Sequence, residues 1–244
     1  MAHIEHVFYA GAGRKEATLG QMIDLAAGDR AYMASPEADS QGGLLLLHAW
    51  WGLNQPMQDL ADRLADDGFT VVAADLFDGV VLDTIEDADA HGEDEEAMEE
   101  SYFSKANHGL DALLAALQAP TVGIVAFSFG AWYARRVAKE RSEVEALVLF
   151  YGGDGFQVPE RSGGGHLRYL GHFAGEDPYE EEDPAGVGPF HSRLQELDPL
   201  NGAYLYPGAK HWFFEADRPE FDPEASRLAY SRTLEFLQEC LPRG

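Results

Sequence analysis

The chain has 244 residues with one cysteine, few basic residues and no long apolar run. Its single cysteine, Cys240, cannot form a disulfide within the chain, which agrees with a reducing compartment. The longest apolar stretch, residues 122–134, contains Ser128 and two glycines and is too short to span a bilayer. Residues 1–15 carry Glu5 and lack the basic start and apolar stretch of a secretory signal. We therefore expect a cytoplasmic protein that makes no use of a membrane.

Basic residues are scarce, since 17 Lys plus Arg stand against 43 Asp plus Glu and the formal net charge is −26. This balance argues against nucleic acid or an anionic membrane surface as a partner, because both require a basic patch that displaces counterions. The densest acidic runs are residues 93–100 and 180–183, which suit a highly soluble surface, with adaptation to salt as one explanation. We expect a monomer or homodimer whose ligand is a neutral small molecule.

Strands and helices are expected to alternate along a single domain, residues 1–244. A hairpin is expected at residues 22–35, and a helix capped by Asn54 and ended by Gly68 follows a buried strand at residues 44–49. Further strands are expected at residues 70–74, 121–127, 146–151, 166–173 and 202–206, and further helices in a long acidic stretch ending at Ala119 and at residues 223–241. The alternation predicts an α/β fold with a mostly parallel sheet and helices on both faces.

The turn at residues 126–130, Ala-Phe-Ser-Phe-Gly, carries the clearest chemical signal. An apolar strand there meets a helix at Ser128, with a small residue two positions before it and another two positions after it. A nucleophile elbow needs small residues at these places because strand and helix pass close together. The common pattern has glycine where this chain has Ala126. The N–H of Phe129, the residue after the nucleophile, would point at an oxyanion.

A serine nucleophile needs a base and an acid, which on this fold come later in the chain in the order acid, then histidine. Asp177 and His211 each follow a predicted strand, so the three side chains are expected to meet at the carboxyl edge of the sheet. Several other side chains are less favourable candidates for these roles, namely the acids Asp154 and Glu176 and the histidines His166, His172 and His191.

From about residue 31 to residue 237 the chain resembles the dienelactone hydrolase family of α/β-hydrolases. The resemblance is carried by four ordered blocks, residues 44–54, 72–77, the elbow with 151–153, and 172–177 with 206–211. It implies an α/β-hydrolase fold and a triad of Ser128, Asp177 and His211. By position in the first block, it also implies that the backbone N–H of Trp50 is the second oxyanion donor.

The chain departs from the namesake enzymes of that family in three ways. They have a cysteine nucleophile where this chain has Ser128, and a glutamate that interacts with the thiol where it has Ala49. The two changes are consistent with each other, because a hydroxyl has no thiolate for the glutamate to manage. The namesakes also bind a substrate carboxylate through arginines. The corresponding neighbourhoods here contain Asp78 and Glu215, with Arg218 displaced, and we expect them to repel an anionic substrate.

Aromatic residues flank the predicted strand ends, and about half of them are expected simply to pack the core. The proposed substrate-binding residues are Trp51, Trp132, Tyr151 and Trp212. With the resemblance, they predict a serine hydrolase that cleaves a small neutral ester or lactone through an acyl-enzyme and needs no cofactor or metal.

Other functions remain open at this point. The same triad could hydrolyse thioesters or transfer an acyl group to an acceptor other than water, and a silent relative could bind a ligand or a protein. The weakest alternative is a metal-dependent hydrolase. It would rest on His3 and His6 or on the acidic residues 93–100, which lack the glycine-punctuated spacing of a calcium loop.

Overall fold

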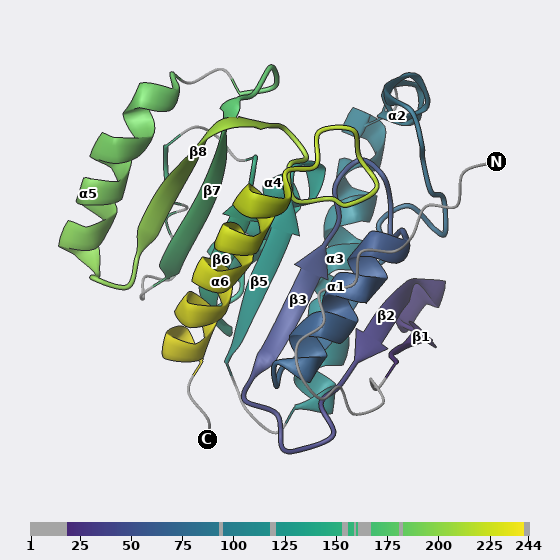
Figure 1. Ribbon diagram of the computed structural model, residues 1–244. Coiled ribbons are helices and arrows are strands. Elements are labelled where there is room, and N and C mark those ends of the chain that lie inside the picture. The colour runs from purple at the N-terminus through teal and green to yellow at the C-terminus, as the bar shows by residue number, and fades with distance from the viewer. Residues whose placement is uncertain are drawn as a thin grey trace.

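Eight strands form one sheet in the part of the chain that the computed structural model describes, which is residues 19–92, 95–117, 121–152, 156–158, 160, 167–180 and 183–241 (Figure 1). The strands are β1 (Gln21–Asp24), β2 (Arg30–Ala34), β3 (Gly43–Leu47), β4 (Thr70–Ala74), β5 (Val122–Phe127), β6 (Val144–Phe150), β7 (Arg168–Glu176) and β8 (Gly202–Lys210). Their order across the sheet is β1-β2-β4-β3-β5-β6-β7-β8.

The sheet is parallel from β4 to β8 and antiparallel only where β1 pairs with β2 and β2 with β4. Strands β3, β4 and β5 are buried along their whole length, as their uninterrupted apolar sequences require. The expected hairpin is present as β1 and β2, with Ile23 opposite Ala31. The prediction of a mostly parallel α/β fold is confirmed.

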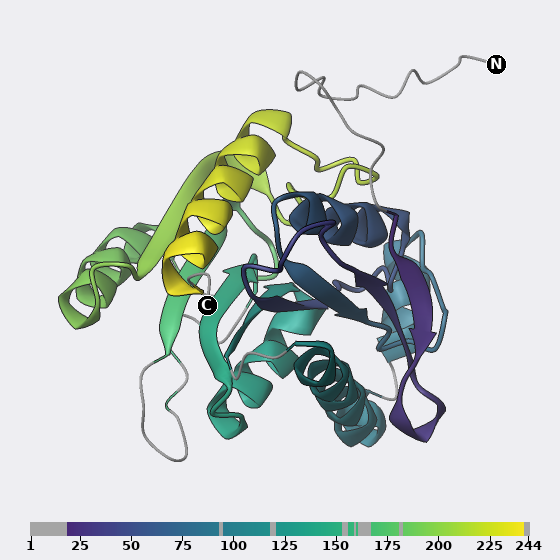
Figure 2. The ribbon, with the colours of Figure 1, turned by 90° about the horizontal axis from the view of Figure 1, so that it is seen from below.

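Helices cover both faces of the sheet, as Figure 2 shows along the strands. The helices are α1 (Gln55–Asp66), α2 (Ile85–Gly92), α3 (Glu95–Ala116), α4 (Phe129–Glu140), α5 (Val187–Leu197) and α6 (Pro223–Cys240), with 3₁₀ turns at Ala26–Gly28 and Pro184–Gly186. Helices α1 and α6 enclose one apolar cluster against the sheet, and α3, α4 and α5 enclose the other. Asn54 caps α1 by accepting a hydrogen bond from the Met57 N–H at 3.2 Å.

Two features differ from the sequence expectation. The acidic stretch expected as one long helix is divided into α2 and α3. Strands β7 and β8 run further than expected, to Glu176 and Lys210, which pair with each other beyond a shift in register. The shift has a local cause, because Pro207 has no N–H to donate to the ladder and the Gly175 backbone approaches it closely.

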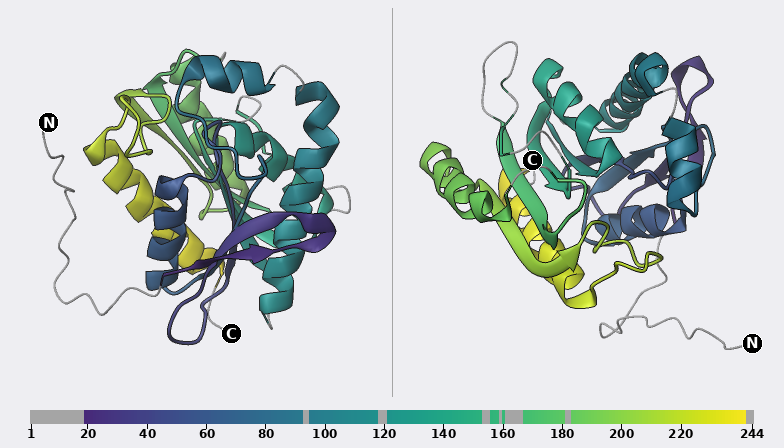
Figure 3. Two further views of the ribbon diagram at one scale, coloured as in Figure 1. Left: turned by 90° about the vertical axis from the view of Figure 1, so that its right-hand side faces the viewer. Right: turned by 90° about the horizontal axis from the view of Figure 1, so that it is seen from above.

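The carboxyl ends of the parallel strands gather at one edge, the top of the sheet in Figure 1, and the right-hand view of Figure 3 looks down on this edge. None of the described helices is both long and apolar enough to cross a bilayer. All eight strands share one sheet. That the whole chain, residues 1–244, is one domain stays a prediction, because the described ranges leave several segments out.

Candidate active site

Ser128 lies in the sharp turn between β5 and α4, with φ of 46° and ψ of −114°. A non-glycine residue with positive φ is strained, and the surrounding backbone holds it there. A Cβ added to Gly130 would lie 2.6 Å from the carbonyl oxygen of His48, at the end of β3. Glycine is therefore required at that place. Ala126, in contrast, is fully buried within β5, where its methyl group is accommodated.

His211 lies between Ser128 and Asp177 and forms hydrogen bonds with both. Its Nε2 is 2.8 Å from Ser128 Oγ, and its Nδ1 is 2.7 Å and 2.8 Å from the two Asp177 carboxylate oxygens. The side chains of His211 and Asp177 expose only 6% and 4% of their surface. When Nδ1 carries the proton, the imidazole donates to the carboxylate, and Nε2 is free to accept a proton from the serine hydroxyl.

The extended ends of β7 and β8 position Asp177 and His211. Asp177 directly follows β7 and His211 directly follows β8, and these strands are neighbours in the sheet. Asp177 Oδ1 also accepts a hydrogen bond from the backbone N–H of Tyr179 at 3.0 Å, which fixes the loop after the acid. The structure thus brings together all three residues that the sequence nominated.

The competing residues lie elsewhere or are engaged. Glu176 is exposed and paired with β8, and His191 lies near the Ala203 backbone, 3.0 Å from its carbonyl oxygen. His172 is fully buried, with its ring nitrogens 2.8 Å from Tyr206 Oη and 2.9 Å from Thr233 Oγ1. Two other residues weighed above, Asp154 and His166, fall outside the described residues, as do His3 and His6.

The two proposed oxyanion donors are backbone groups near Ser128. Phe129 is the first residue of α4, where helix N–H groups have no partner within the helix. Trp50 lies just after β3, the strand whose end packs against the start of α4. The side chain of Phe129 has a separate function, since its ring packs against Phe77 and Tyr102. The position of both N–H groups is compatible with an oxyanion hole, and their role stays a prediction.

The four proposed substrate-binding side chains differ in exposure. Trp51, Tyr151 and Trp212 expose only 2%, 1% and 3% of their surface, so they present little area to a ligand. Trp132 is 50% exposed on α4. Their role in binding substrate stays a prediction, and the first three also serve as core.

Sequence reasoning missed Tyr179, an exposed aromatic residue beside the triad. Its ring centroid is 4.9 Å from that of His211, 5.1 Å from Trp212 and 5.8 Å from the partly buried Trp50. Tyr179 is 44% exposed. Its position two residues after Asp177, at the end of an Asp-Pro turn, is the sequence feature that could have indicated it. Tyr179 packs against His211 and Trp50 packs against Tyr179, and these two side chains together are called the aromatic wall.

The charges that were expected to repel an anion are largely neutralised. Asp78 forms an ion pair with Lys105 at 2.7 Å. Burial raises the pKa of Glu215 to about 8, so that this side chain is mostly protonated at pH 7. The Arg218 guanidinium lies over the Trp51 ring, 4.3 Å from its centroid, and is already engaged by an ion pair with Asp217 at 3.2 Å and a hydrogen bond to the Asp83 carbonyl oxygen at 3.0 Å. Asp78 and Glu215 therefore contribute less negative charge than the sequence suggests.

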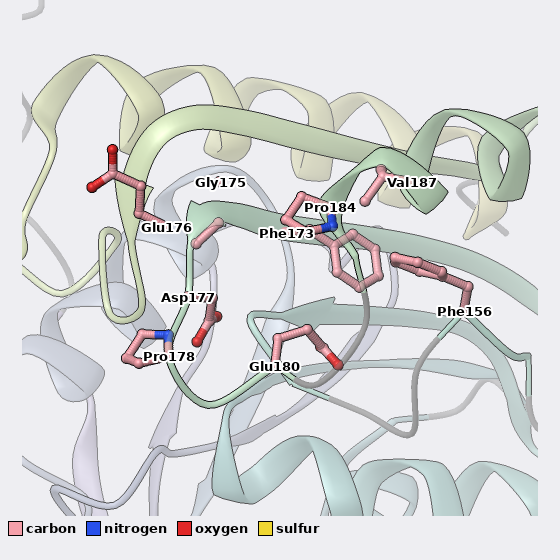
Figure 4. Close-up of a pocket in the computed structure, with 10 residues that line it drawn as sticks. Phe156, Phe173, Gly175, Glu176, Asp177, Pro178, Glu180, Pro184 and Val187 are labelled. Atoms are coloured by element: carbon pink, nitrogen blue, oxygen red, sulfur yellow. The ribbon is translucent and has the colours of Figure 1, made fainter.

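A cavity of about 380 Å³ opens beside Asp177, between the end of β7 and the start of α5 (Figure 4). Apolar side chains form much of its lining, namely Phe156, Phe173, Pro178, Pro184 and Val187. Glu176, Asp177 and Glu180 add carboxylates to the lining. Among the described residues, no three His, Cys, Asp or Glu side chains are grouped as metal ligands would be.

Comparison with known proteins identifies the family of this chain. The model of the family described as "Dienelactone hydrolase family" matches residues 30–241. The chain belongs to the dienelactone hydrolase family.

The relatives that match this chain cover different shares of it. A protein of Azospirillum brasilense named "Putative carboxymethylenebutenolidase" is 27% identical over 240 residues, which cover 90% of this chain and 98% of that protein. "Protein usf" of Aquifex pyrophilus is 33% identical over 76 residues, which cover 29% of this chain. That match spans about a third of Protein usf, 32% of its length.

A dienelactone hydrolase-like promiscuous phosphotriesterase from metagenomic libraries has a similar fold, with a TM-score of 0.70 and 20% identity. The alignment covers 91% of this chain and 98% of that one. Membership of the dienelactone hydrolase family supports a hydrolase with an α/β fold. The catalytic role of Ser128, His211 and Asp177 stays a prediction.

Proposed function

We propose that the protein is a serine hydrolase that cleaves a small neutral ester or lactone through an acyl-enzyme. The observation that carries this proposal is the continuous path of hydrogen bonds from Ser128 Oγ through His211 to Asp177, with lengths of 2.8 Å and 2.7 Å. A hydroxyl is a weak nucleophile alone, and this arrangement supplies the base and the group that orients it.

In the first half of the reaction, Ser128 Oγ attacks the carbonyl carbon while its proton moves to His211 Nε2. The N–H groups of Phe129 and Trp50 stabilise the negative charge on the carbonyl oxygen. When the tetrahedral intermediate collapses, the bond to the alkoxide breaks and His211 gives that alkoxide the proton. The alcohol leaves, or stays attached to the acyl group if the substrate is a lactone.

In the second half, water attacks the acyl-enzyme, and His211 takes a proton from the water and returns it to Ser128 Oγ. Asp177 holds the imidazole with its proton on Nδ1 and stabilises the imidazolium that forms twice in each cycle. The products are a carboxylic acid and a regenerated hydroxyl.

The surroundings of Ser128 support a neutral substrate. Arg218 is engaged with Trp51 and Asp83, and Trp50 and Tyr179 offer aromatic surface next to His211. Such surface suits an apolar or aromatic group near the scissile carbonyl.

The test compares neutral p-nitrophenyl esters of increasing chain length with an anionic lactone and with a thioester, using the Ser128→Ala variant as control. We expect turnover of the neutral esters that depends on Ser128. Faster turnover of the anionic lactone would contradict the substrate class, and a preference for the thioester would favour the alternative use of the triad. No turnover of any of them by the intact protein would favour a binding role.

A further inference from the structure

Tyr151 and Glu215 form a buried pair beside the triad that the mechanism above does not use. Each side chain exposes only 1% of its surface. Tyr151 Oη donates a hydrogen bond to Glu215 Oε1 at 2.9 Å, and Glu215 Oε2 is buried without a hydrogen-bond partner among the described residues. A buried carboxyl with one unpaired oxygen costs stability, so its presence needs an explanation.

Tyr151 belongs to the nucleophile side of the site. It directly follows β6 with φ of 34°, and its N–H donates to the carbonyl oxygen of His172 at 2.8 Å. A Cβ added to the next residue, Gly152, would lie 2.9 Å from Ser128 Cα. The backbone that carries Tyr151 is therefore packed directly against the elbow.

Glu215 belongs to the histidine side. The N–H of Phe213 donates to the carbonyl oxygen of Lys210 at 3.1 Å, and the N–H of Glu215 donates to that of Trp212 at 3.0 Å. Trp212 itself has φ of 63°. These contacts make residues 210–215 a tight turn that contains both His211 and Glu215. A displacement of Glu215 would therefore also displace His211.

The ring of Tyr151 spans the two sides. Its centroid is 4.9 Å from that of the His211 imidazole, with an angle of 57° between the planes. Neighbouring aromatic rings hold the body of the Tyr151 ring, and the hydrogen bond to Glu215 fixes its hydroxyl end. We infer that Tyr151 and Glu215 are positioning residues, whose hydrogen bond holds the His211 turn at the correct distance from Ser128. This inference rests on the proposed hydrolase function.

The electrostatics agree with such a role. Burial raises the pKa of Glu215 to about 8, and the charge of Asp217 raises it further, while the Tyr151 hydrogen bond and Arg218 lower it. At pH 7 the carboxyl is therefore mostly neutral, and its Oε1 accepts the hydrogen bond that the Tyr151 hydroxyl donates. A permanent charge on this buried carboxyl, close to that of Asp217, is avoided, and the anchoring hydrogen bond remains.

The experiment measures kcat and KM on a neutral p-nitrophenyl ester at pH 7 for Tyr151→Phe, Glu215→Ala, Glu215→Gln and the Tyr151→Phe/Glu215→Ala double variant. We expect kcat to fall about tenfold in Tyr151→Phe and Glu215→Ala, with KM within about twofold, because misplacing a base mainly slows the chemical step. Glu215→Gln keeps a carbonyl acceptor and should recover most of kcat. The double variant should lose no more than either single variant.

Tyr32→Phe is the matched control. Tyr32 lies on β2, at the antiparallel side of the sheet, and its Oη also donates a hydrogen bond to a buried carboxylate, Asp62 Oδ1, at 2.9 Å. It should leave kcat unchanged even if it lowers the melting temperature as much as Tyr151→Phe does. An unchanged kcat in Tyr151→Phe, an equal loss in Tyr32→Phe, or losses that multiply in the double variant would each overturn the inference.

Failure of the positioning role can be told apart from failure of the proposed function. If the wild-type protein hydrolyses the ester and Ser128→Ala does not, the function stands, and only the behaviour of Tyr151 and Glu215 is in question. If wild-type turnover does not depend on Ser128, the function falls, and the positioning role falls with it.

Discussion

Two buried histidines in this protein, His211 and His172, lie at the end and in the middle of neighbouring strands and have opposite surroundings. Both are nearly enclosed, with 5% and 0% of their surface exposed, and both ring nitrogens of each have a side-chain partner. The partners differ. His211 lies between a carboxylate and a partly exposed hydroxyl, whereas His172 lies between two buried hydroxyls, those of Tyr206 and Thr233.

The difference shows what burial alone does to a histidine. Desolvation, with a further contribution from the charge of Arg232, lowers the pKa of His172 to about 3, so that it stays neutral at all ordinary pH values. Such a side chain is a structural hydrogen-bonding bridge. In the proposed mechanism, the Asp177 carboxylate stabilises a transient imidazolium at His211, and of the two histidines it is His211 that lies next to Ser128, the proposed nucleophile. Chemistry is expected at the strand end and packing in the strand interior.

The largest effect should come from removing the charged partner of His211. Asp177→Asn keeps the shape of the side chain but takes away the charge and favours the wrong imidazole tautomer, so kcat should fall by about 10³- to 10⁴-fold. Steady-state ester hydrolysis with the folded variant tests this. A loss of less than about tenfold would mean that His211 does not depend on Asp177.

The corresponding change at the other histidine should affect stability instead. His172→Gln loses the bridge between Tyr206 and Thr233, and we expect the free energy of unfolding to fall by about 1–3 kcal/mol. Its kcat should stay within about threefold of the wild-type value. Urea unfolding and ester kinetics on the same sample measure both quantities, and a large drop in kcat without destabilisation would contradict the structural role.

The pH dependence of stability should sharpen the contrast. A histidine whose pKa is lower in the folded state than in the unfolded chain takes up a proton on unfolding. His172, with a pKa of about 3, and His48, with a pKa of about 4, therefore contribute stability that is complete above pH 6.5 and is lost as the pH falls toward these values. Glu215 acts with the opposite sign, because its pKa is raised from 4.5 to about 8 and its contribution is lost as the pH rises through that interval.

Unfolding in urea at pH 5 and pH 7 separates these contributions. Relative to the wild-type protein, His172→Gln should lose more stability at pH 7 than at pH 5, because the contribution of His172 is larger at pH 7. Glu215→Gln should lose more stability at pH 5 than at pH 7, because the contribution of Glu215 is larger at pH 5. Identical pH dependence in the wild-type protein and both variants would show that neither group changes protonation on unfolding.

The sequence was sufficient to predict that Ser128, His211 and Asp177 meet, because each follows a strand at a turn with a recognisable pattern, and their hydrogen bonds agree with that prediction. The small residues around Ser128 and the loops after β7 and β8 are local signals of this kind. Tyr179 and the pair of Tyr151 and Glu215 were not identified in their roles, because those roles come from contacts between segments far apart in the chain. The neutral state of Glu215 also depends on burial, which its own sequence neighbourhood does not reveal.

The smallest effect should come from the aromatic wall. Tyr179→Ala removes exposed surface beside His211, and we expect KM for an aromatic ester to rise by about three- to tenfold with little change in kcat. Trp132→Ala removes a side chain of comparable exposure from α4 and serves as the matched comparison. An equal rise in KM in both variants would support the predicted role of Trp132 in binding substrate, and no rise in Tyr179→Ala would exclude a role of the aromatic wall.

Covalent labelling with a fluorophosphonate, followed by intact-mass measurement and peptide mapping, tests directly whether Ser128 is a nucleophile activated by His211. We expect one adduct per chain, located on Ser128, absent from Ser128→Ala and formed much more slowly by Asp177→Asn. Tyr32→Phe should label at the wild-type rate. An active protein that acquires no adduct, or one whose adduct lies on another residue and abolishes activity, would show that Ser128 is not the nucleophile.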